Sequence, residues 1–161
     1  MAPSKRTMLF VCLLVAALAV AVPIAQGQII TIGPIAGVYR IQGLLFCSLN
    51  GTASVGTNGA ILTPPFSNAT VQLRCGANDI VLGTVQTRAD GTFSILLDVS
   101  FYTLPQILSG CRVVVTTPLA KCNVSLPSTG TLTSALTSIG STIVPSLPTS
   151  NIGTGVFSVS A

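Results

Sequence analysis

Few residues in this chain could carry out chemistry. It contains no histidine, tryptophan or glutamate, which excludes an imidazole base, a histidine-ligated metal and any pair of glutamates. Carboxylate chemistry would depend on Asp79, Asp90 and Asp98 alone, and none of them has the spacing typical of an aspartic protease or a calcium loop. A Ser–Lys dyad through Lys121 is compatible with the composition, but no motif marks its serine. We therefore predict a protein without catalytic residues, metal or cofactor.

The first 27 residues have the pattern of a secretory signal peptide. Lys5 and Arg6 precede an apolar run over 9–22, and small residues stand before Gln28, where cleavage is expected. A run of about 14 residues is short for a bilayer, which needs about 20 in a helix. The sequence therefore predicts export, with no transmembrane anchor after cleavage.

Cleavage also removes Cys12 and leaves four cysteines, at positions 47, 75, 111 and 122. No CxxC pair is present, which disfavours a zinc site or a redox centre. In an oxidising compartment two disulfides are expected, and four cysteines allow three connectivities. Each bridge would close a loop of tens of residues and stabilise the fold by on the order of 3 to 4.5 kcal/mol.

The charge is small and dispersed. Of 161 residues, 49% are hydrophobic and only 6% are charged, which indicates a packed chain and not a disordered one. After cleavage three aspartates remain against five cations, a net charge of +2. The cations, which do not cluster as nucleic-acid binding requires, are Arg40, Arg74, Arg88, Arg112 and Lys121.

Three sequons lie in the same part of the chain as the cysteines. They are Asn50 (NGT), Asn68 (NAT) and Asn123 (NVS), all candidate N-glycosylation sites in an exported protein. We expect each asparagine to lie at a turn or a strand edge.

Apolar and polar residues alternate through the middle of the chain and predict short strands at 38–46, 71–75, 79–87, 93–98 and 111–117. Cys75 and Cys111 fall on the apolar faces, where bridges between two sheets would lie. Asp90 and Gly91 are a turn signal that predicts a hairpin joining 79–87 to 92–98. The fold class is mainly β, a small antiparallel sandwich or barrel.

The composition changes at residue 126, after which no charge occurs. The spacing of Leu132, Leu136, Ile139 and Ile143 predicts a short helix with an apolar stripe, ended by Pro145. The stripe either packs on the sheet or adsorbs to a neutral waxy or lipid surface. The rest reads as a loose tail with a last strand at 155–159. The predicted organisation is a signal peptide (1–27), an apolar lead-in (28–37), a sandwich domain (38–125) and an uncharged extension (126–161).

Four segments carry a family resemblance. QGLLFCSLNGT (42–52), PPFSNATVQLRCG (64–76), TRADGTFSILLD (87–98) and CRVVVTTPLAKCNVSLPSTG (111–130) resemble the phylloplanins, secreted leaf-surface proteins of the pollen Ole e I-like superfamily. The resemblance implies a β-sandwich or barrel with bridges Cys75–Cys111 and Cys47–Cys122. The CxxC that opens many pollen members is missing, since Ser48 and Leu49 follow Cys47.

The same resemblance implies a plant surface defence protein, at the leaf surface or in the apoplast, which inhibits fungi or oomycetes by binding or adsorption. Its partners would be components of microbial or plant surfaces. Two alternatives are a structural module of the extracellular matrix that binds polysaccharide or glycoprotein, and a carrier of a small apolar ligand inside the barrel. The oligomeric state is not predicted.

Overall fold

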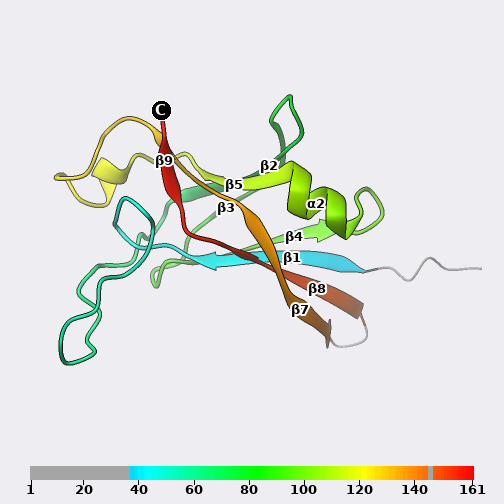
Figure 1. The fold of residues 1–161 in the computed structure, drawn as a ribbon, viewed down its shortest axis with the longest axis horizontal. Helices are drawn as coiled ribbons and strands as arrows, with labels where there is room; N and C mark the ends of the chain where they lie inside the picture. Colours follow the sequence, from blue (N-terminus) through cyan, green and yellow to red (C-terminus); the bar gives the residue numbers. More distant parts are fainter. Residues whose placement is uncertain (1–36, 145–146) are drawn as a thin grey trace, which may run out of the picture. The chain divides into compact units, whose positions relative to one another are not determined.

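The computed structural model describes residues 37–144 and 147–161. The predicted signal peptide, the lead-in as far as residue 36 and Pro145 lie outside the described residues. Within those ranges the strands form two sheets (Figure 1).

The first sheet has four strands in the order β4–β1–β8–β7. Their bounds are Thr92–Asp98 for β4, Val38–Leu44 for β1, Leu147–Thr154 for β8 and Leu136–Val144 for β7. β1 pairs with β4 in antiparallel fashion but with β8 in parallel. The sheet is therefore mixed, where an antiparallel one was predicted.

The second sheet has five strands in the order β3–β2–β5–β6–β9, and all its pairs are antiparallel. Their bounds are Ile80–Gln86 for β3, Thr70–Cys75 for β2, Cys111–Val115 for β5, Thr131–Ser134 for β6 and Ser158–Ser160 for β9. The central strands β2 and β5 are the most buried, and β3 is an exposed edge.

Apolar side chains from both sheets form one core, which confirms the predicted mainly-β sandwich. Every second residue of β2 is buried, so the apolar residues of the alternating pattern point into the core and the polar residues point outward. Each fully buried aliphatic or aromatic side chain contributes about 1.5–3 kcal/mol of transfer free energy. The buried residues on the best-patterned strands are Tyr39, Ile41, Val71, Leu73, Phe93, Ile95, Val113 and Val115.

A short α-helix, α2 (Leu104–Gly110), precedes β5. It begins with a capping box, in which the Gln106 N–H donates to Thr103 Oγ1 and the Thr103 N–H donates to Gln106 Oε1. Ile107 anchors the helix on the core. A single 3₁₀ turn, η1 (Leu119–Lys121), follows β5. No helix of the described part of the chain has the length and apolarity to cross a bilayer.

Asp90 and Gly91 form a turn, but the predicted hairpin between the flanking strands is wrong. β3 lies at an edge of the second sheet and β4 at an edge of the first, so the turn carries the chain between sheets. Gly91 has φ +82°, and a Cβ there would overlap the carbonyl oxygen of Leu45. The N–H of Leu45 donates to the Gly91 carbonyl at 2.9 Å, which holds the turn against the end of β1.

The predicted helix over 132–143 is also wrong, because these residues form β6 and most of β7. Thr137, Ile139, Thr142 and Ile143 are β-branched and favour strand over helix. Residues 147–154, predicted as a loose tail, form β8 between β1 and β7. The uncharged segment therefore supplies strands to both sheets of the sandwich.

Candidate functional site

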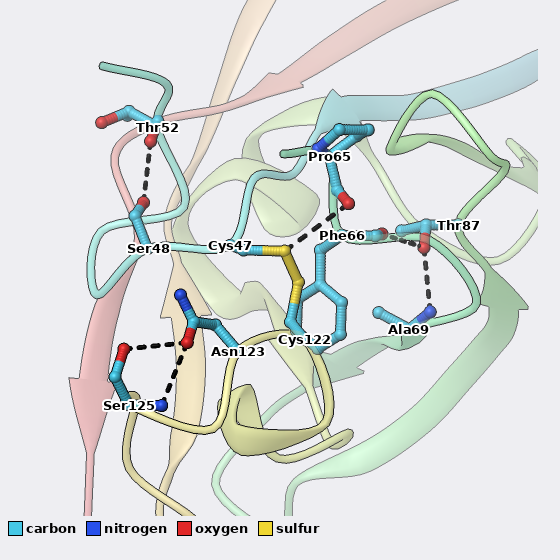
Figure 2. The surroundings of a disulfide bond; sticks show 10 residues. All are labelled: Cys47, Ser48, Thr52, Pro65, Phe66, Ala69, Thr87, Cys122, Asn123 and Ser125. Atoms are coloured by element: carbon cyan, nitrogen blue, oxygen red, sulfur yellow. Dashed lines mark hydrogen bonds between the residues drawn. A yellow bond between two sulfur atoms is a disulfide. The ribbon is translucent and has the colours of Figure 1, made fainter. Parts of the chain in front are cut away.

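The Cys47–Cys122 bridge joins the loop after β1 to the end of η1 (Figure 2). The two Cα atoms are 5.6 Å apart, and 75 residues separate them in sequence. Cys47 Sγ lies 3.5 Å from the Pro65 carbonyl oxygen, and the Cys47 N–H donates to the Pro64 carbonyl at 2.9 Å. The bridge therefore holds three loops together, with Phe66 buried beside it.

The second bridge, Cys75–Cys111, joins directly opposite residues of β2 and β5, with Cα atoms 4.0 Å apart. It lies within one sheet, so the expectation of bridges between the sheets is wrong. Neighbouring antiparallel strands already bring opposite side chains within reach of each other. Both pairs are those that the resemblance implied, and two disulfides are consistent with an extracellular location.

The three sequon asparagines are exposed and lie in or beside turns. Asn50 Oδ1 accepts the N–H and the hydroxyl of Thr52, at 3.1 and 2.7 Å. Asn123 Oδ1 accepts the same groups of Ser125, at 3.0 and 2.8 Å. Asn68 has φ +56°, a left-handed turn conformation. Each position is open to a sugar, and glycosylation stays a prediction.

The predicted surface-adsorbing stripe does not form a single surface. Leu132 and Leu136 are buried in the core, whereas Ile139 and Ile143 on β7 are exposed. Ile139 lies at a bulge of β7 and covers Gly153 of β8. Only the last two members of the stripe could meet a partner.

A hairpin that projects between β1 and β2 was not predicted from the sequence (Figure 1). Residues 54–63, here called the 54–63 hairpin, are closed by a bridge between Val55 and Ile61. The N–H of Leu62 donates to the Ser54 carbonyl at 2.9 Å. Val55, Ile61 and Leu62 are all exposed. The signal that could have found it is the turn dipeptide Asn58–Gly59, where Gly59 has φ +81°.

Beside this hairpin lies an open groove of about 590 Å³, here called the apolar groove. Hydrogen bonds from Leu45 to Gly91 and from Phe66 to Leu45, both 2.9 Å, hold its walls together. The lining is mostly aliphatic, aromatic or proline: Leu44, Phe46, Ile61, Leu62, Thr63, Pro64, Pro65, Asp90 and Thr92.

A larger groove of about 1020 Å³ adjoins the apolar groove and shares Leu44, Phe46, Asp90 and Thr92 with it. It runs past the ends of β1 and β8 as far as Ile139. Both grooves are surface features, because the interior between the sheets is filled by buried side chains. The carrier hypothesis expected a small ligand inside a barrel. In this fold a small ligand would instead bind at the surface.

Charge is scarce in this region, and Asp90 is its acidic group. Its Oδ1 accepts the Thr92 hydroxyl at 2.6 Å and the Thr92 N–H at 3.0 Å. These bonds, with a smaller contribution from the charge of Arg88, hold the pKa of Asp90 below its ordinary value. The carboxylate is thus ionised at neutral pH. Arg88 lines the larger groove only.

The other two aspartates lie elsewhere and serve turns and ion pairs. Asp79 binds Arg74 at 3.1 Å and Arg112 at 2.7 Å, and Asp98 accepts from the Ser100 hydroxyl and N–H. Among residues 37–144 and 147–161, no group of three or more His, Cys, Asp or Glu side chains could hold a metal ion. Lys121 is exposed in η1.

Comparison with known proteins gives a family match over most of the chain, including every residue that the structure describes. A family model described as phylloplanin antifungal protein matches residues 35–161. A curated relative, phylloplanin of Nicotiana tabacum, is 44% identical over 105 residues, which are 65% of this chain and 63% of the relative. The match thus spans less than two thirds of the tobacco protein.

One solved structure is also similar. The crystal structure of the major plantain pollen allergen Pla l 1 aligns with a TM-score of 0.36 and 16% sequence identity. The alignment covers 78% of this chain and 98% of the allergen.

Proposed function

Since this chain belongs to the phylloplanin antifungal protein family, we propose that it is a plant surface defence protein that inhibits germination or growth of fungi or oomycetes. The observation that carries the proposal is the family match over residues 35–161.

The sequence marks no catalytic residues, and we infer that the inhibition arises from contact between surfaces. The two grooves and the 54–63 hairpin support this mechanism, because they gather exposed apolar side chains at one end of β1. Exposed apolar surface of this kind marks binding sites in soluble proteins. The partners proposed are components of microbial or plant surfaces.

The proposed location is the leaf surface or the apoplast. Two disulfides and a predicted signal peptide support export. With 6% charged residues, the chain has little charged surface to keep it from adsorbing to neutral material.

The proposal is tested with the protein recovered from the medium of a host that expresses the full chain. Spores of a fungus and of an oomycete are incubated with it, and germination is counted against a concentration series. We expect dose-dependent inhibition that disappears after reduction and alkylation of both disulfides. Normal germination at every concentration, with the disulfides intact by mass, would contradict the proposal.

A further inference from the structure

The apolar groove combines two features that together define a ligand. Leu44, Ile61, Leu62 and Pro64 offer a hydrocarbon wall. Among the described residues that line it, Asp90 carries the only charge. A ligand that fits both must bring an apolar body and a hydrogen-bond donor, with no negative charge.

Asp90 is able to receive such a donor. Its Oδ1 is occupied by Thr92, whereas Oδ2 accepts no hydrogen bond from the described part of the chain. Asp90 is exposed at the groove, so a hydroxyl group can approach Oδ2 without displacing the turn. A hydroxyl donor to a carboxylate forms a charge-assisted hydrogen bond, which is stronger than a neutral one.

We propose that the apolar groove binds a neutral lipid alcohol, a molecule with a hydrocarbon body and one hydroxyl group. The body lies against Leu44, Ile61 and Leu62, and the hydroxyl donates to Asp90. This inference rests on the proposed function, because it specifies the class of ligand that a surface-binding defence protein would take. Carboxylate ligands are disfavoured by the like charge of Asp90.

The neighbouring charge does not reverse this preference. Arg88 would attract an acid, but it lines the larger groove and its charge already acts on Asp90. No lysine or arginine contributes to the apolar groove among the described residues, so an anionic headgroup finds no ion pair there. The charge pattern therefore favours the alcohol over the matching acid.

The test is calorimetric titration of the secreted protein with 1-decanol and with decanoate at neutral pH. The two probes have equal chain lengths and differ in the headgroup. We expect 1-decanol to bind about tenfold more tightly, the effect of one close like charge near a protein surface. A sterol titrated in parallel distinguishes a fused-ring body from a linear one.

Two variants locate the site. Leu62→Ser should weaken 1-decanol binding by about fivefold or more through loss of apolar contact. Leu96→Ser is the matched control, because Leu96 is 63% exposed against 66% for Leu62 and lines neither groove. Asp90→Asn should bring decanoate to within about threefold of 1-decanol, while the new amide oxygen still accepts from Thr92.

Equal affinity for the two probes, absence of binding, or equal losses in Leu62→Ser and Leu96→Ser would overturn the inference. Spore germination is assayed with the same samples. Inhibition without alcohol binding overturns this inference and leaves the proposed function standing. Alcohol binding at the groove without inhibition supports the inference and counts against the proposed function.

Discussion

Arg74 and Arg112 face each other directly across β2 and β5, although both are positively charged. The carboxylate of Asp79 binds both, one oxygen to each guanidinium. Like charges at opposite positions of neighbouring strands are destabilising, and Asp79 relieves the repulsion.

Replacing this shared carboxylate should therefore cost more than losing one surface ion pair. We expect Asp79→Asn to lower the free energy of unfolding by about 1 kcal/mol at low salt and by less at high salt, because the side chains are partly exposed. Urea unfolding at two salt concentrations measures it. Asp98→Asn, which removes a turn carboxylate without an ion pair, is the control. A salt-independent difference would contradict the repulsion argument.

The two disulfides should contribute unequally in the order of their loop lengths. They span 36 and 75 residues, which in the chain-entropy model corresponds to about 3.8 and about 4.5 kcal/mol. We expect the Cys47→Ala/Cys122→Ala double variant to lower the free energy of unfolding by slightly more than the Cys75→Ala/Cys111→Ala variant. Unfolding midpoints and secreted yield are the measurements. An unchanged midpoint in either variant would contradict a structural role for that bridge.

Gly91 and Gly59 allow two costs of adding a side chain to be separated, the cost of a left-handed backbone and the cost of steric overlap with a neighbour. Their φ angles are +82° and +81°, but an added Cβ at Gly59 meets nothing within 4 Å while at Gly91 it overlaps Leu45. Gly59→Ala should cost about 1 kcal/mol from the left-handed backbone. Gly91→Ala should cost several kcal/mol more and distort the end of β1. Thermal unfolding compares them, and equal costs would show that the contact with Leu45 is unimportant.

Acid should weaken the fold through two exposed carboxylates. Hydrogen bonds from Thr92 and from Ser100 hold the pKa values of Asp90 and Asp98 below 3.8. A carboxylate whose pKa is lower in the folded state than in the unfolded state stabilises the fold at pH values above the unfolded-state pKa. This stabilisation is lost as the pH falls through the folded-state pKa. Stability should therefore decline as pH drops below 3.8, and less steeply in Asp90→Asn. Urea midpoints from about pH 2 to pH 6 test this, and identical profiles would refute it.

The sequons predict a change in mass. Enzymatic deglycosylation of the secreted protein should lower its intact mass, and Asn50→Gln and Asn68→Gln should each remove one step. Asn123 should be less occupied because it follows the bridged Cys122. Asn58→Gln, an exposed asparagine outside any sequon, is the control. A mass unaffected by the enzyme would show that the sites are empty.

Local patterns predicted most of the individual strands. The alternation at 71–75 identified β2 because each strand residue points to the opposite face from the last. Asp90–Gly91 identified a turn but not its partners, because a turn fixes a chain reversal and not the sheet to which each strand belongs. The parallel pairing of β1 with β8 joins residues that are more than a hundred positions apart in the sequence, so no local sequence pattern could predict it.

The candidate site was harder to predict for a related reason. Leu44, Ile61 and Leu62 show no period that separates a groove wall from a core strand, so only their place in the fold exposes them. The stripe from Leu132 to Ile143 matched a helical spacing by chance, because β6 and β7 leave two members buried and two outside. Burial in the folded structure separates core positions from exposed ones, whereas their spacing in the sequence does not.

The parallel pairing of β1 with β8 also sets an order of assembly. β1 lies between β4 and β8, so its partner on one side is synthesised more than a hundred residues after it. All four bridged cysteines are synthesised before β8, and both disulfides can form while the first sheet is unfinished. A chain that ends before residue 147 would thus be cross-linked yet leave β1 with an open edge. Premature termination should therefore yield an oxidised, aggregation-prone product and not a smaller functional one.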